Sequence, residues 1–206
     1  MEVQIVVYDG FDELDVFGLY EPLKMAGFDT RLLSLEKQDF VTASHGLKVM
    51  VDGQVSTSKK PAILCIPGGG WLTRGARGAF YESEKGDILT LIKDFHKGGV
   101  TIASVCTGAL LVGKAGLLSG RPAITNHGAL DALRACGAKI AFARVVDDGD
   151  IVTAGGVTSS LDLALWLVER FASEAKAKEV STQLEYVRRG PIWRQDASPV
   201  SAQSQS

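Results

Sequence analysis

The feature that most constrains the fold of this chain is the stretch VTIASVCTGALLVGKAG, residues 100–116. Residues 100–105 form a continuous apolar run rich in β-branched side chains, which is typical of a buried strand. Residues 109–112 instead favour a helix. Cys106 lies between the two segments, where the nucleophile of a strand–turn–helix elbow is found. The stretch therefore predicts a sheet covered by helices, with a cysteine at a sharp turn.

Two interpretations of Cys106 follow from this stretch alone. In the first, the thiol stands exposed at the end of the strand, beside the positive end of the helix dipole, which favours the thiolate. In the second, it is a buried cysteine that packs as a small hydrophobe, as most free cysteines do. Its place at the end of the apolar run, and not within it, keeps the first interpretation open.

The composition narrows the class of protein. A chain of 206 residues suits one domain with a full core. The net charge of −2 gives no electrostatic argument for a nucleic acid or an anionic membrane as a partner. The cysteines are odd in number and widely spaced, which fits neither a disulfide framework nor a zinc site and indicates a reducing compartment. The first residues do not resemble a signal peptide, and no apolar run is long enough to span a bilayer. We therefore expect a cytoplasmic enzyme or sensor domain.

Strand-like and helix-like segments alternate along almost the whole chain, which predicts an α/β domain with a mostly parallel sheet and helices on both faces. Residues 1–194 are expected to form this single domain, and the polar residues 195–206 a disordered tail. Three local expectations are less regular. Pro22 predicts a kink or a late helix start near residues 18–22, residues 71–83 a loop, and residues 174–188 a final amphipathic helix.

Four polar or glycine-rich segments come directly after predicted strands. In such sheets, sites form outside the carboxyl ends of the strands, so these segments are expected to converge. This convergence favours a functional role for the cysteine. Three glycines after one strand can cradle an anion or an oxyanion, although a tight turn needs the same residues. The four segments are residues 12–15, 68–70, 106–107 and 126–127.

These motifs resemble a known family. The segments FDELDVFGLYEPL, CIPGGG, ASVCTGALLVGKAGLLSGRPAITNH and VTAGGVTSSLDLAL are similar to the ThiJ/PfpI superfamily, over about residues 3–187. That resemblance implies a flavodoxin-like three-layer sandwich, the fold of class I glutamine amidotransferases. The pattern around the cysteine is most similar to the isonitrile (isocyanide) hydratase branch. Amidase-domain transcription regulators share it but carry a helix-turn-helix domain afterwards, which we do not expect here.

The resemblance implies a set of site residues. Cys106 would be the nucleophile, and Asp15 would occupy the position of the acidic residue beside it. The backbone N–H groups of Gly69 or Gly70, and of Thr107, would supply oxyanion-type donors. For Asp15 to act as an acid, burial or the neighbouring thiolate must raise its pKa.

Two further residues bear on the reaction. Thr107 stands where protease-like members have a histidine, and without that adjacent base peptidase chemistry is in doubt. His127 lies near where other members place a histidine close to the cysteine. It would be either an auxiliary group or a packing residue, and both alternatives stay open.

The reaction implied is the addition of water to an isonitrile, which gives an N-substituted formamide through a thioimidate on Cys106. It needs no metal or organic cofactor. A glyoxalase-like or amidase-type hydrolase of the same superfamily is the second enzyme hypothesis. A third hypothesis is a redox or stress sensor, in which Cys106 oxidises to a sulfinate held by Asp15. The expected partners are a small-molecule substrate and a second copy of the chain.

Overall fold

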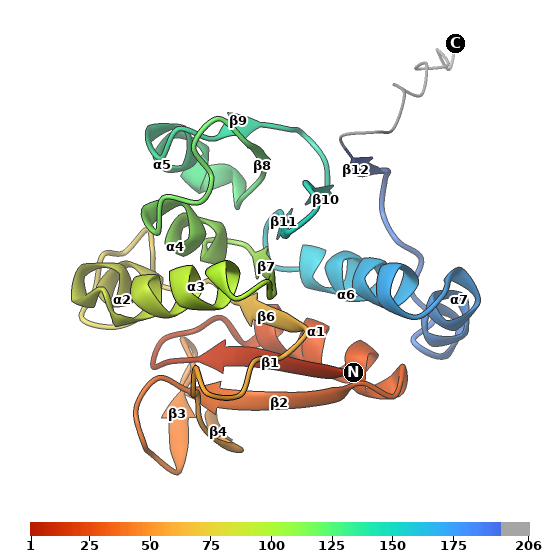
Figure 1. Cartoon of the computed structure of the whole chain (residues 1–206), viewed down its shortest axis with the longest axis horizontal. Coiled ribbons are helices and arrows are strands. Elements are labelled where there is room, and N and C mark those ends of the chain that lie inside the picture. The colour runs from red at the N-terminus through yellow and green to blue at the C-terminus, as the bar shows by residue number, and fades with distance from the viewer. Residues whose placement is uncertain (195–206) are drawn as a thin grey trace.

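A computed structural model of the protein describes residues 1–194. Its centre is an eight-stranded sheet with the order β12-β10-β11-β7-β6-β1-β2-β5 (Figure 1). Every neighbouring pair in this sheet is parallel except β10 and β11. The strands are Glu2–Val7 (β1), Asp29–Ser34 (β2), Gly53–Gln54 (β5), Ile63–Ile66 (β6), Thr101–Val105 (β7), Val145–Asp147 (β10), Ile151–Ala154 (β11) and Ile192–Arg194 (β12).

The helices form two groups around the sheet, and the predicted three-layer α/β sandwich is confirmed. Helices α1 (Glu13–Met25), α6 (Ser159–Phe171) and α7 (Glu174–Gln183) make one layer, in which α6 packs on both others. Helices α2 (Ala79–Lys85), α3 (Asp87–Lys97) and α4 (Gly108–Lys114) make the other. Within residues 1–194, none of these helices is long and apolar enough to cross a membrane.

Two smaller units flank the sandwich. Figure 1 shows one at the top, where the short strands β8 (Pro122–Ala123) and β9 (Lys139–Ile140) lie with α5 (Leu130–Ala135) and the 3-10 turn η1 (His127–Ala129). The other is an antiparallel hairpin of β3 (Phe40–Thr42) and β4 (Lys48–Met50). The expected tail, residues 195–206, lies outside the described residues.

The central strands explain why the site forms where it does. All four residues of β6 are fully buried, because a parallel sheet with helices on both faces leaves no strand face in water. Strands β1, β6, β7 and β11 run parallel and side by side, so their carboxyl ends meet at one edge of the sheet. The segments that follow these strands are thereby brought together.

The expectation of a kink at Pro22 is wrong. Helix α1 is continuous from Glu13 to Met25, with Pro22 inside it and buried. A proline inside a helix costs about 3 kcal/mol, but packing offsets this cost. Gly18, four residues earlier, lies so close to α6 that an added Cβ would be 2.1 Å from the Ser160 hydroxyl. The tight contact between the two helices holds α1 in one piece.

Two other boundaries differ from expectation. Residues 71–83 are not entirely a loop, because α2 begins at Ala79. Its start is fixed by a backbone hydrogen bond from the Ala79 N–H to the carbonyl of Gly69, 2.7 Å away, which the local sequence does not reveal. The final helix ends at Gln183 and not at residue 188. The chain then returns to the sheet as β12, where residue 193 pairs with β10.

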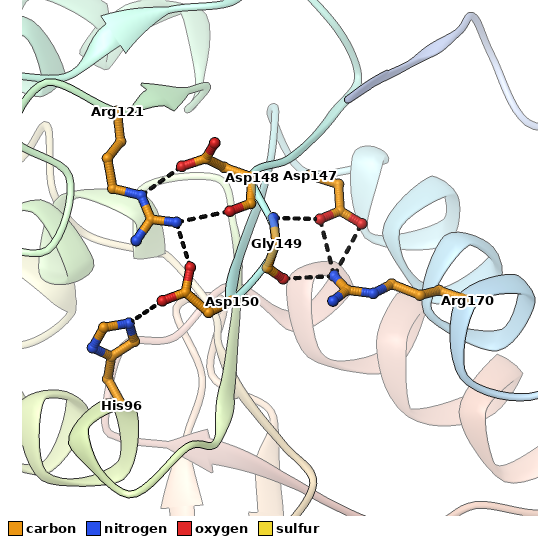
Figure 2. Close-up of polar contacts among 7 residues, drawn as sticks. All are labelled: His96, Arg121, Asp147, Asp148, Gly149, Asp150 and Arg170. Carbon is orange, nitrogen blue, oxygen red and sulfur yellow. Dashed lines mark hydrogen bonds and ion pairs between the residues drawn. The ribbon is translucent and has the colours of Figure 1, made fainter. Parts of the chain in front are cut away.

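A network of ion pairs connects the turn of the β10–β11 hairpin to neighbouring elements (Figure 2). This turn lies at the amino end of β11, away from the carboxyl ends of the strands where the segments above meet. The Asp150 carboxylate pairs with Arg121 and with His96 of α3, whose Nε2 is 2.6 Å away. On the other side of the turn, Arg170 of α6 donates to Asp147 at 2.9 Å. The network joins both helical layers through the one antiparallel turn of the sheet.

This network is expected to contribute to stability only above the acid range. Hydrogen bonding to Arg121 holds the pKa of Asp150 down at about 2, and His96 adds to the effect. A carboxylate with a lowered folded-state pKa stabilises the fold above its unfolded value of about 3.9, and this stabilisation is lost as the pH falls towards 2. Asp150→Asn should therefore lower the Tm at about pH 7 and narrow the difference in Tm between about pH 7 and about pH 3. Thermal unfolding across this range checks it.

Asp39→Asn is the matched control for this measurement. Asp39 is exposed, and its carboxylate forms no ion pair within residues 1–194. Its substitution should leave the acid dependence of the Tm unchanged. An Asp150→Asn protein that loses as much Tm on acidification as the wild type would contradict the role given to the network.

Candidate active site

Cys106 forms a strained turn between β7 and α4. Its φ is 55°, in the left-handed region that side chains other than glycine rarely adopt. The turn is held on two sides: the Cys106 N–H donates to the carbonyl of Gly155 at 2.8 Å, and the Thr125 hydroxyl donates to the Cys106 carbonyl at 2.7 Å. The predicted strand–turn–helix elbow is therefore present, with its strain balanced by hydrogen bonds from two other segments.

The thiol of Cys106 is buried, with 5% of the residue exposed, so the expectation of an exposed thiol is wrong. Burial and, after it, the nearby charge of Asp15 raise the pKa of this thiol to about 12. The backbone N–H groups of Val157 and Thr107 stabilise the thiolate but do not compensate. The expectation that the helix end favours the thiolate fails for the same reason: α4 has only seven residues, and desolvation outweighs its dipole.

Asp15 lies in the first turn of α1 and is fully buried beside this thiol. Its Oδ2 accepts a hydrogen bond from the Gly68 N–H at 2.8 Å. Burial, and then the charge of Asp12, raise the pKa of Asp15 well above its ordinary value, while the hydrogen bonds from Gly68 and Cys106 lower it. The condition for Asp15 to act as an acid is therefore met. A carboxyl and a thiol that lie side by side can exchange a proton directly.

The glycine turn after β6 brings the carboxyl and the elbow together. A Cβ on Gly68 would lie 2.5 Å from the Thr107 nitrogen and 3.0 Å from Asp15 Oδ2, so only glycine fits. The Gly69 N–H donates to the Thr107 hydroxyl at 3.0 Å, so it is occupied and not directed at the sulfur. Gly70 lines a neighbouring cavity of about 500 Å³. Of the expected donors, the Thr107 N–H is the one that faces the thiol.

His127 begins the short turn η1 and is exposed. Within residues 1–194 its ring forms no hydrogen bond with another side chain or with the backbone. Thr125, two residues earlier, is the member of this segment that contacts the elbow.

In the loop around Trp71, the side chains lie in different environments. Trp71 is buried edge-on against Phe80, whereas Arg77 lines the cavity beside Gly70.

Sequence reasoning missed two residues of this site, Thr125 and Val157. Val157 follows the pair Gly155–Gly156 at the end of β11, so it carries the same signal, glycines after a strand, that drew attention to residues 68–70. Thr125 precedes the segment 126–127, in which the histidine is the more evident candidate for chemistry. Within residues 1–194, no group of three or more His, Cys, Asp or Glu side chains is arranged to hold a metal ion.

The site combines a strained cysteine elbow, a buried carboxyl beside the thiol and a glycine turn next to both. On a mostly parallel α/β sheet, this combination defines a class of cysteine-elbow α/β proteins. The family model of the DJ-1/PfpI family matches residues 1–170, and this chain belongs to that family. The predicted membership of the ThiJ/PfpI superfamily is thus confirmed.

Individual relatives are similar over most of the chain. An isonitrile hydratase of Pseudomonas putida is 31% identical over 206 residues, which cover 99% of this chain and 86% of the relative. Among solved structures, Drosophila melanogaster DJ-1beta has a TM-score of 0.81 at 21% identity, covering 91% of this chain and 98% of its own, which shows a shared fold. An oxidized Toxoplasma gondii DJ-1 has a TM-score of 0.80 at 25% identity, covering 91% of this chain and 99% of its own.

Proposed function

We propose that this protein is an isonitrile hydratase-like enzyme, which adds water to an isonitrile and releases an N-substituted formamide. The observation that carries the proposal is the buried contact between the Cys106 thiol and the Asp15 carboxyl, each with a raised pKa. The similarity to the P. putida isonitrile hydratase over nearly the whole chain supports it.

In the first step, the sulfur of Cys106 bonds to the terminal isonitrile carbon. Asp15 in its acid form gives its proton to that carbon and takes up the proton of the thiol, so the sulfur never exists as a free thiolate. The product is a neutral thioimidate, R–N=CH–S–Cys106. A thiol whose pKa is about 12 suits this route, because its proton passes to a neighbour as the bond forms.

In the second step, water adds to the thioimidate carbon. Asp15, which is again in its acid form, gives its proton to the imidate nitrogen and takes up one proton from the attacking water. The C–S bond then breaks, the sulfur regains a proton from the new hydroxyl through Asp15, and R–NH–CHO leaves. The N–H groups of Thr107 and Val157 stabilise the departing sulfur. The sum is R–NC + H₂O → R–NH–CHO, with both side chains restored.

Two other functions use the same residues. A glyoxalase-like or other hydrolytic reaction would need a base for its substrate, and His127 is the candidate that the resemblance to the family offers. A redox sensor would oxidise Cys106 to a sulfinate, an idea favoured by the similarity to a T. gondii DJ-1 whose structure is of an oxidized form. The sensor hypothesis needs no turnover at all.

The test is to incubate the purified protein with a simple alkyl isonitrile and follow the formamide by NMR. We expect steady turnover, and His127→Ala should retain it within about twofold, because the exposed imidazole takes no part in the steps above. Carbonyl chemistry would instead lose activity in that variant. A folded protein that converts no isonitrile would contradict the proposal, and a peroxide-dependent mass increase at Cys106 without turnover would favour the sensor.

A further inference from the structure

Tyr8 is a buried residue directly after β1 that none of the steps above uses. Only 2% of it is exposed, and its hydroxyl donates a hydrogen bond to the carbonyl of Pro67 at 2.6 Å. A buried tyrosine hydroxyl needs a hydrogen-bond partner. Here that partner, Pro67, is the residue directly before Gly68 in the glycine turn. Tyr8 therefore contacts the candidate site through the backbone.

The Pro67 carbonyl and the Gly68 N–H belong to the same peptide unit. The bond is trans, since residues 1–194 contain no cis peptide, so the two groups point in opposite directions. Tyr8 donates to one end of this unit, and the other end donates to Asp15 Oδ2 at 2.8 Å. One rigid peptide thus links the phenol to the carboxyl through two hydrogen bonds.

We propose that Tyr8 is a positioning residue, which orients and polarises the Pro67–Gly68 peptide and thereby sets the protonation of Asp15. A carbonyl that accepts a hydrogen bond makes the N–H of its own peptide a stronger donor. A stronger donor favours the carboxylate over the acid. Loss of the Tyr8 hydroxyl should therefore keep Asp15 protonated to a higher pH. The inference takes Asp15 as the acid of the proposed function.

Burial and, after it, the surrounding charges keep the Tyr8 hydroxyl protonated, and so a donor, throughout the physiological range. Burial raises the pKa of its phenol well above the ordinary value, and the charges of Asp15, Glu82, Cys106 and Asp12 act in the same direction. The groups that face Asp15 itself are Asp12 at the N-cap of its helix, Cys106 on the elbow and the Gly68 amide on the turn. Of these, the amide is the one that Tyr8 controls.

The test is a direct titration of the Asp15 carboxyl by ¹³C NMR in the wild type, in Tyr8→Phe and in Tyr81→Phe. Tyr81 is a matched control, because it is partly exposed and its hydroxyl forms no hydrogen bond within residues 1–194. We expect Tyr8→Phe to raise the midpoint of Asp15 by about half to one pH unit and Tyr81→Phe to leave it unchanged. No shift in Tyr8→Phe, or an equal shift in both variants, would overturn the inference.

A second variant covers the case in which Tyr8→Phe does not fold. Site-specific 3-fluorotyrosine at position 8 keeps the ring and makes the hydroxyl a stronger donor, so the midpoint of Asp15 should fall. A rise or no change there would overturn the inference. The titration needs no substrate: a protein that hydrates no isonitrile but shows both shifts would contradict the proposed function and leave the role of Tyr8 supported.

Discussion

Replacing Cys106 with alanine is expected to abolish isonitrile hydration. The variant keeps the Asp15 carboxyl and the glycine turn but has no atom that can bond to the isonitrile carbon, so no thioimidate forms. Removal of a nucleophile that acts together with its proton partner lowers kcat by about a thousandfold or more. Formamide release at saturating isonitrile, followed by NMR against a no-enzyme blank, measures the loss.

Cys136→Ala provides the matched control for this experiment. Cys136 is another free thiol, only partly buried, that follows α5 and packs against Gly113 at the far end of α4 from Cys106. Its removal should leave turnover within about twofold of the wild type, while a thermal melt of both variants shows that the fold is intact. Formamide formation that persists in Cys106→Ala at a rate near that of the wild type would exclude the thioimidate mechanism.

The elbow and the burial of Asp15 could be predicted from the sequence because each depends on local pattern. The apolar run before Cys106 identifies the strand, and parallel strands place their carboxyl ends at one edge. Asp15 interrupts an apolar helix face between Leu14 and Val16, which predicts partial burial, and the structure buries it completely. Each of these features is encoded in its own short stretch of sequence.

The environment of the thiol could not be predicted, because distant segments create it. Burial of Cys106 depends on Thr125, Gly155 and Val157, which follow two later strands and meet the elbow only in the folded sheet. The hydrogen bond from the Gly69 N–H to the Thr107 hydroxyl likewise joins two segments that meet only in the folded protein. A helix-dipole argument from the sequence alone therefore gives the wrong direction for the thiol pKa, since desolvation enters only with the fold.

The largest effect on stability is expected at Gly108, the first residue of α4. A Cβ at this position would lie 2.2 Å from the carbonyl oxygen of Ile66 and 2.8 Å from that of Pro67, both backbone atoms that cannot rotate away. Alanine is otherwise favoured over glycine in a helix, so any loss must come from this clash. Gly108→Ala should lower the free energy of unfolding by about 3 kcal/mol, measured by urea denaturation.

Gly75→Ala separates this clash from a general effect of replacing glycine. The nearest atom to a Cβ at Gly75 is the Thr73 hydroxyl oxygen at 3.9 Å, so the substitution should change the free energy of unfolding by less than about 0.5 kcal/mol. Because Gly108 packs on the end of β6, its displacement also moves the turn that holds Asp15. A Gly108→Ala protein as stable as Gly75→Ala would show that the elbow helix and the glycine turn are not in rigid contact, and the close pairing of acid and thiol would lose its structural basis.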